Sequence, residues 1–179
     1  MEFIKNKFFI ILISIVSITQ YGCFNSVDPV FFADVERQFE IPAGLNTIET
    51  HFFILQDIPT FLDQNLELYG LPYDNVTSIN PGAGRIESAF GNIDWTFVQT
   101  VEIYAVSNSD PNLKRQILYS REPDFINRSS IVMFNTYSDI KEIMSEPVID
   151  LEVRLKFRQF VPANINARIV FEYGVYNEM

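Results

Sequence analysis

The stretch VIDLEVRLKFRQF, residues 148 to 160, decides the fold class of this chain. Its odd-numbered positions from Ile149 to Phe157 are apolar, and its even-numbered positions from Asp150 to Arg158 are charged. Successive side chains of an extended strand point to opposite faces, so one face is apolar and the other is charged. The stretch therefore predicts a β-strand that is buried on one face and solvated on the other.

The next segment repeats this pattern. Ile165 to Tyr176 also alternates apolar and polar side chains, and Pro162-Ala163-Asn164 separates it from the first stretch. The two segments are predicted to form a C-terminal hairpin in which opposite charges pair across the strands.

Most of the earlier sequence has the same short, alternating character. Strands are predicted at Val30 to Ile41, Thr47 to Leu55, Val76 to Asn80, Arg85 to Phe90, Ile93 to Ser107, Arg115 to Arg121 and Ser129 to Asn135. The turn-forming residues Pro81-Gly82-Ala83-Gly84 predict a hairpin between the third and fourth of these.

Helical patterns are brief. Pro59 to Tyr69 has apolar residues at helical spacing, and Asp139 to Glu142 (DIKE) is typical of a weak capping box. Many strands and two short helical patches predict an all-β fold, an immunoglobulin-like or related antiparallel β-sandwich with one or two short helices.

The first 22 residues have the pattern of an export signal. Lys5 and Lys7 form a basic head, and Phe8 to Ile18 is an almost continuous apolar run. A helix of that length spans about 16 Å, whereas the hydrocarbon core of a bilayer is about 30 Å thick. The segment is therefore predicted to be a secretory signal peptide.

Gly22 and Cys23 follow this apolar run. The arrangement resembles a bacterial lipoprotein signal, in which a small residue precedes an invariant cysteine, although Gln20 and Tyr21 depart from the usual aliphatic and small residues. The resemblance implies cleavage before Cys23, lipidation of its sulfur, and a location in the cell envelope. It covers this address only and implies nothing about the fold of the domain.

The cysteine count agrees with that expectation. Cys23 is the only cysteine of the chain, and an odd thiol in an exported protein is exposed to oxidation unless it is consumed. A conventional signal peptide or an uncleaved anchor are the alternatives. The expected organisation is a signal peptide at 1–22, a lipidated tether at 23–29, and a single domain at 30–179.

Charge and chemistry narrow the function classes. The net charge of −10 argues against nucleic acid as a partner. His51 is the only histidine and lies in an apolar strand, so it is interpreted as a half-buried structural residue. No catalytic motif, cofactor motif or metal-binding motif is recognisable.

Two pairs of acids deserve consideration as catalytic carboxylates. Asp34 with Glu36, and Asp150 with Glu152, each share a strand face about 7 Å apart, a separation compatible with acid–base chemistry. Because Arg154 and other cations continue the second pair, an ordinary solvated face is the preferred interpretation.

Calcium binding is a weaker alternative. Asn108, Asp110 and Asn112, or Asp74 and Asn75, offer oxygen ligands, but no loop has the spacing of a calcium motif. A turn-forming role is preferred. No metal site and no cofactor are predicted.

Aromatic side chains are the remaining candidates for a binding role. A platform for sugars or a peptide could be drawn from Tyr69, Tyr73, Trp95, Tyr119, Tyr137, Tyr173 and Tyr176. Tyr69 and Tyr73 flank Leu71-Pro72 in a predicted loop, which makes them the preferred ligand-binding candidates.

The resulting hypothesis is a non-enzymatic, lipid-anchored envelope protein that binds a protein or glycan partner or has a structural part. The alternatives are a small carboxylate-dependent envelope hydrolase and an assembly subunit that pairs through sheet edges.

Overall fold

The computed structural model describes residues 28–91, 93–121 and 129–177. Within these ranges the chain forms eight strands: β1 (Phe31–Ile41), β2 (Thr50–Pro59), β3 (Val76–Ser88), β4 (Val98–Ser107), β5 (Lys114–Arg121), β6 (Ser130–Asn135), β7 (Val148–Phe157) and β8 (Ile165–Asn177). The short helices are α2 (Leu62–Leu68), η1 (Tyr73–Asn75), η2 (Trp95–Phe97) and α3 (Lys141–Met144). The all-β prediction with two short α-helices is confirmed for this part of the chain.

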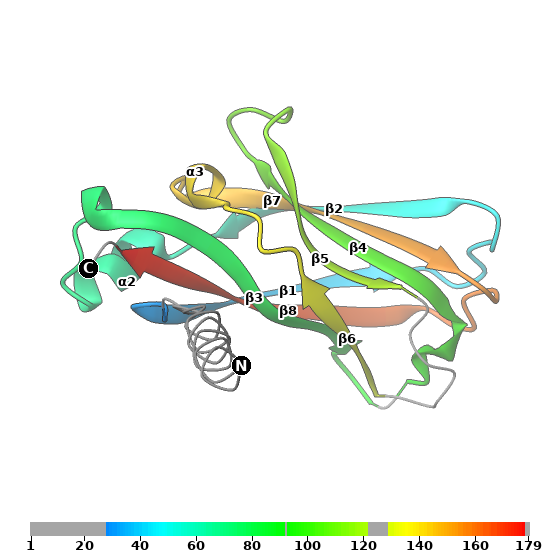
Figure 1. Ribbon diagram of the computed structural model, residues 1–179. Coiled ribbons are helices and arrows are strands. Elements are labelled where there is room, and N and C mark those ends of the chain that lie inside the picture. The colour runs from blue at the N-terminus through cyan, green and yellow to red at the C-terminus, as the bar shows by residue number, and fades with distance from the viewer. Residues whose placement is uncertain (1–27, 92, 122–128, 178–179) are drawn as a thin grey trace, which may run out of the picture.

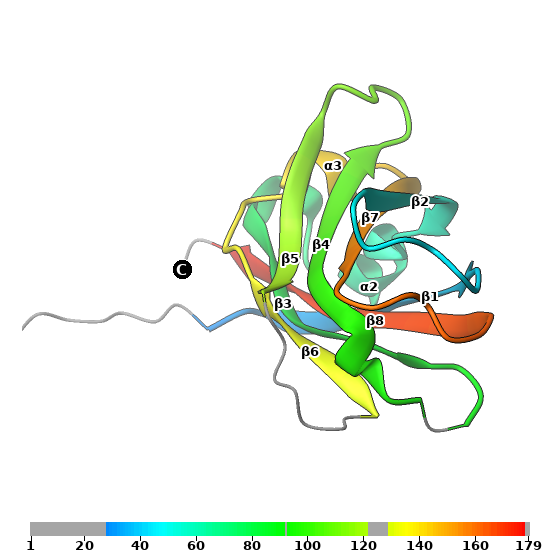
Figure 2. The ribbon, with the colours of Figure 1, turned by 90° about the vertical axis from the view of Figure 1, so that its right-hand side faces the viewer.

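All strand pairs are antiparallel, and the spatial order is β1-β8-β3-β6-β5-β4-β7-β2. The sheet curves so that β1, β8, β3 and β6 (the β8 sheet) face β2, β7, β4 and β5 (the β7 sheet), as Figure 1 and Figure 2 show. β6 connects the two, because Ser130 to Met133 pair with β3 and Phe134 and Asn135 pair with β5. On the opposite side the Arg37 Nη2 of β1 donates to the Gln56 carbonyl of β2 at 3.0 Å, so the barrel is nearly closed.

This order is that of a jelly roll: the first strand pairs with the last, the second with the seventh, the third with the sixth and the fourth with the fifth. In an immunoglobulin-like order, the first strand would lie beside the second. The broader prediction of an antiparallel β fold is therefore confirmed, and the immunoglobulin-like strand order is not observed. Side-chain alternation identifies strands but carries no information on which strands pair.

The predicted C-terminal hairpin is wrong for the same reason. β7 pairs with β2 and β4, whereas β8 pairs with β1 and β3. The link between them therefore crosses from one sheet to the other, and the charges of the two strands do not meet.

The predicted turn at Pro81-Gly82-Ala83-Gly84 is also wrong, since β3 runs straight through it. The register with β8 shifts between Pro81 and Gly84, which marks a β-bulge. A Cβ on Gly84 would lie 2.5 Å from a methyl of Leu118, and one on Gly82 would lie 2.6 Å from the Cγ of Glu172. These glycines therefore permit close approach inside a sheet.

Local chemistry accounts for the helices. Leu62 and Leu66 of α2 are buried, and Gly70 follows the helix with φ of 62°. At α3, Asp139 Oδ1 accepts the backbone N–H of Lys141 at 3.0 Å and that of Ile79 at 3.1 Å. The acid thus binds the N–H of the first helical residue and joins the helix start to β3, but it is not the N-cap residue, and no capping box with Glu142 forms.

One hydrophobic cluster fills the space between the sheets and includes residues from all eight described strands. The inward side chains of β7, from Ile149 to Phe157, are at most 1% exposed. Tyr173 is completely buried, and its hydroxyl donates to the Thr60 carbonyl at 2.9 Å, which satisfies its one polar group.

Candidate functional site

His51 has the half-buried position that the sequence predicts. It is half-buried in β2, and its ring centroid lies 5.4 Å from that of Phe157. Its Nε2 lies 3.0 Å from the Asn46 carbonyl oxygen and therefore acts as the donor. The imidazole therefore has both a hydrogen-bond partner and an aromatic packing partner within the chain.

The four carboxylates considered for hydrolysis lie on the outward faces of two different sheets. Asp34 and Glu36 are on β1 in the β8 sheet, whereas Asp150 and Glu152 are on β7 in the β7 sheet. The structure therefore does not bring the two pairs together.

Glu152 forms ion pairs with two cations. It accepts from Lys114 Nζ at 3.0 Å and from Arg154 Nε at 2.6 Å. Burial favours its neutral form, but the hydrogen bonds from these cations outweigh burial and hold the pKa of Glu152 below its ordinary value. A general acid needs a raised pKa, so this environment acts in the opposite direction.

The turn at 108–112 is stabilised from within. Asp110 Oδ1 accepts from the backbone N–H and the side-chain amide of Asn112, at 3.0 and 3.1 Å. Within the described residues, no group of three or more His, Cys, Asp or Glu side chains could hold a metal ion. Asp74 is exposed in η1.

Glu146, which was not singled out in the sequence, anchors this turn. Its carboxylate accepts the backbone N–H groups of Asn108 and Ser109 at 2.8 and 3.2 Å, and the hydroxyls of Ser107 and Ser109. Burial opposes ionisation, but these four donors outweigh it and lower the pKa of Glu146. The role is structural: it joins the β4–β5 turn to the start of β7.

Tyr69 and Tyr73, the predicted ligand-binding residues, contact different intramolecular partners. Tyr69 stacks on Phe31 with centroids 4.5 Å apart and 7° between the planes. Tyr73 lies under Lys141, whose Nζ is 4.8 Å from the ring centroid. Each ring therefore has its own intramolecular partner, although they remain 52% and 37% exposed.

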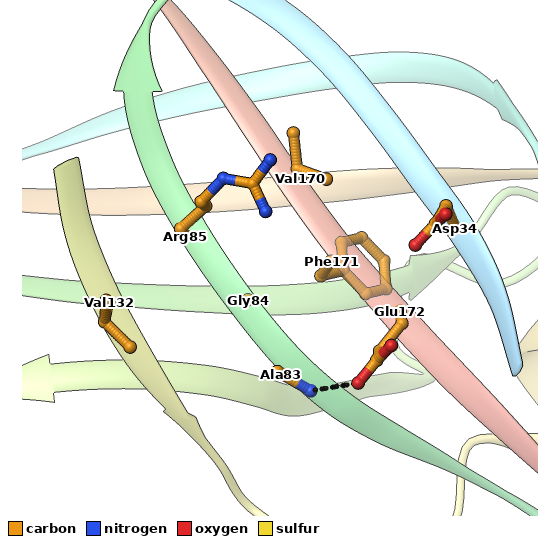
Figure 3. A pocket seen from close by; sticks show the side chains of 8 residues that line it. All are labelled: Asp34, Ala83, Gly84, Arg85, Val132, Val170, Phe171 and Glu172. Atoms are coloured by element: carbon orange, nitrogen blue, oxygen red, sulfur yellow. Dashed lines mark hydrogen bonds between the residues drawn. The ribbon is translucent and has the colours of Figure 1, made fainter.

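A shallow depression of about 250 Å³ lies outside the β8 sheet at the β3 bulge, lined by Asp34, Ala83, Gly84, Arg85, Val132, Val170, Phe171 and Glu172. Figure 3 shows Glu172 reaching Ala83, whose N–H donates to it at 3.2 Å. Asp34 stands opposite Glu172 in the strand register. Arg85 is engaged by Glu87 at 2.9 Å.

The outward face of the β7 sheet carries a more extended arrangement. Strand register aligns Phe52, Arg154, Glu102, Tyr119 and Phe134 across β2, β7, β4, β5 and β6. We call this set the aromatic row. Phe52 is 59% exposed and Phe134 is 66% exposed, so both ends of the row are open to solvent.

Cations lie against the rings of this face. The Cζ of Arg154 is 5.3 Å from the ring centroid of Phe52 and 4.2 Å from that of Tyr104. The rings of Tyr119 and Phe134 are 5.9 Å apart, with the Arg121 guanidinium 6.0 Å from Tyr119. Such contacts each contribute about 0.5–1 kcal/mol at exposed sites.

Beside it runs a second aligned set, Thr50, Lys156, Thr100 and Arg121 across β2, β7, β4 and β5. We call this the cation row. In the described part of the chain, neither Lys156 nor Arg121 has a carboxylate within ion-pair distance. The two cations are therefore not compensated there.

Sequence reasoning missed most of this face. Tyr119 was among the aromatic candidates, but Phe52, Tyr104, Phe134 and Arg154 were not. Their outward position was readable from strand alternation, since Tyr104, Phe134 and Arg154 each lie next to a buried residue and Phe52 lies between two half-buried residues. Their common location was not readable, because it requires the strand order.

The predicted lipidation site Cys23 lies outside the described residues. Among the residues that the structure does describe, no helix has the length and apolar character needed to cross a membrane.

No protein-family model and no curated protein matches the chain. Two similar solved structures are those of infectious bursal disease virus, strain Gt (14% identity, TM-score 0.38, 82% of this chain covered) and strain Gx (13%, 0.36 and 79%). This chain spans 32% of the length of each viral chain. Likeness at this level carries no functional argument, and the jelly-roll order given above depends only on this chain's own strand pairing.

Proposed function

We propose that this chain is an exported protein of the cell envelope, anchored by lipid at Cys23, whose domain binds a protein or glycan partner and catalyses no reaction. The observation that carries the binding part is the aromatic row. It extends over five neighbouring strands and exposes Phe52 and Phe134 at its two ends. Aromatic side chains that lie together on an outer face are typical of binding surfaces.

The anchor is supported by the sequence. A basic head, a short apolar run and Gly22-Cys23 follow one another in the order of a lipoprotein signal, and Cys23 is the only thiol. Several acyl chains on one residue would anchor the protein stably, whereas one chain alone binds only marginally.

The proposal that the domain catalyses no reaction is supported by the ion pairs and hydrogen bonds of the candidate acids. Glu36 is paired with Arg168 at 3.3 Å, Glu152 is paired with two cations, and Asp150 accepts the backbone N–H of Asp57 at 3.0 Å. Acids held in this way serve the stability of the sheet surface.

The anchor is tested by intact-mass analysis of the full chain purified from membranes. We expect a polypeptide that begins at Cys23 and carries acyl mass, and a Cys23→Ala variant that is neither acylated nor retained in the membrane fraction. An uncut chain with a free thiol in the cytosolic fraction would overturn the proposal.

The binding part is tested by chemical cross-linking of intact cells. Phe134→Ser removes the exposed end of the aromatic row, and Val132→Ser is a matched control two residues away on the same outward side of β6. We expect specific cross-linked species that persist in Val132→Ser and disappear in Phe134→Ser. Equal cross-linking in both variants would show that this face is not the binding surface.

A further inference from the structure

The charge of the β7 sheet differs from that of the chain as a whole. The chain has a net charge of −10. On the outward face of this sheet the cations are Lys114, Arg121, Arg154 and Lys156, and the carboxylates are Asp57, Glu102, Asp150 and Glu152. The face therefore has balanced charges on an otherwise acidic protein, and Lys156 and Arg121 lie at the end of the sheet away from Asp57 and Asp150.

Only part of this positive charge is compensated inside the sheet. Arg154 and Lys114 pair with Glu152 at 2.6 and 3.0 Å, and Arg154 lies 4.0 Å from Glu102. Lys156 and Arg121, in the cation row, have no carboxylate partner among the described residues. Desolvating them against a neutral or basic partner would be unfavourable, whereas an acidic partner would neutralise them.

Thr100 lies between Lys156 and Arg121 in the cation row. Because Lys156 and Arg121 both pair with Thr100 in register, they are two strand spacings apart, or about 10 Å. Both side chains are long and flexible enough to reach an acid group above Thr100, whose hydroxyl adds a third hydrogen-bonding group.

The aromatic rings beside these cations indicate which class of acidic ligand fits the face. Arg121 lies over Tyr119, which packs against the exposed ring of Phe134. A sugar ring can stack on such aromatic surfaces while its acid group meets the cations. A peptide strand would need a free sheet edge, and this row lies in the interior of the sheet, where each strand from β7 to β5 already has two neighbours.

We propose that this face binds an acidic glycan: Lys156, Thr100 and Arg121 hold its carboxylate or sulfate groups, and Tyr119 and Phe134 stack against its sugar rings. This names the partner class for the surface given under the proposed function and rests on that proposal. Phosphodiester polymers offer the same combination of charge and rings, so single-stranded DNA is included as a competitor in the test.

The experiment is calorimetric titration of the purified full chain in detergent with four probes: polygalacturonate, neutral dextran, poly-L-glutamate and single-stranded DNA. We expect measurable binding of polygalacturonate and weaker binding of the other three. The double variant Lys156→Gln/Arg121→Gln should reduce the affinity for polygalacturonate about tenfold or more, since one tenfold step corresponds to about 1.4 kcal/mol. Phe134→Ser should also weaken it.

Arg85→Gln is the matched control, because it removes one guanidinium from the outward face of the other sheet. We expect it to bind polygalacturonate as the unaltered chain does. Circular dichroism of each variant checks that the fold is retained.

Equal loss in Arg85→Gln and in the double variant would reduce the effect to general charge and overturn the inference. Absence of polygalacturonate binding, or stronger binding of poly-L-glutamate or DNA, would also overturn it. None of these results touches the proposed function, which fails only if the membrane-derived chain carries no lipid or if the Phe134→Ser cross-linking pattern is unchanged.

Discussion

Arg154 in β7 and Arg168 in β8 occupy comparable positions, each at the outward face of a central strand. Arg168 is surrounded by acids: it donates to Glu87 and to Glu36, and Arg85 shares Glu87. Arg154 also pairs with acids, but it lies between the rings of Phe52 and Tyr104.

The difference shows how one fold makes two kinds of surface. The inward positions of both sheets hold the same class of apolar side chains, so the core places no constraint on what lies outside. Function on a jelly roll therefore has to be argued from the surface residues and not from the fold.

The largest expected effect tests whether the inward faces of the two sheets contribute equally to the stability of the core. Leu155→Ala in β7 and Ile169→Ala in β8 each remove a side chain that is at most 1% exposed. Both should lower the free energy of unfolding by about 2–5 kcal/mol, because each leaves a cavity in the core. Urea denaturation measures this, and a loss confined to one variant would mean that one sheet contributes little to the core.

The next effect tests the two arginines. Arg154→Ala should lower the free energy of unfolding by about 1–2 kcal/mol, because it removes two cation–π contacts as well as ion pairs. Arg168→Ala should lower the free energy of unfolding by less, since its ion pairs are open to solvent. The difference in unfolding free energy between the two variants should change little in 1 M salt, because salt screens the ion pairs but not the contacts of Arg154 with its rings.

Arg154→Lys is a useful control for this comparison. It keeps the charge but not the planar guanidinium, so we expect a loss between those of the unaltered chain and Arg154→Ala. Equal stability of Arg154→Lys and the unaltered chain would show that the stacking of Arg154 on its rings contributes nothing measurable.

The smallest effect concerns pH. The hydrogen bond from Arg85 lowers the pKa of Glu87, and burial opposes it only in part. The pKa of Glu152 is lowered as well, against burial, by Lys114 and Arg154. Both folded-state values lie below the ordinary 4.5, so the folded state binds fewer protons than the unfolded state in that range.

The stability from these two acids is therefore present above pH 4.5 and is lost as the pH falls through the folded-state pKa values. Glu87→Gln and Glu152→Gln should each flatten the decline of the unfolding free energy between neutral pH and pH 3, measured by urea denaturation at fixed ionic strength. A decline as steep as that of the unaltered chain would contradict the ion-pair assignment for the acid concerned.

The sequence was sufficient where the signal is local. Strict alternation from Ile149 to Phe157 predicted a half-buried strand, and β7 is such a strand. The single histidine was correctly predicted to be half-buried, because it lies in an apolar strand. Leu62 and Leu66 correctly predicted a short amphipathic helix.

The sequence was insufficient where strands had to be paired. The turn at Pro162-Ala163-Asn164 has the composition of a hairpin turn, yet it leads from one sheet to the other. The glycines at 82 and 84 have the composition of a turn, yet they serve close packing against Glu172 and Leu118. Composition reports what the backbone can do, and long-range contacts decide which of these options is used.

The amino-acid sequence by itself determined that this protein is built from short strands with one apolar face each, since side-chain alternation is a property of consecutive residues. It also carries the whole case for lipidation at Cys23. Only the tertiary structure decided that Lys156, Thr100 and Arg121 lie in one row beside Tyr119 and Phe134. These residues come from four strands, and a surface that crosses strands exists only once their order and register are set.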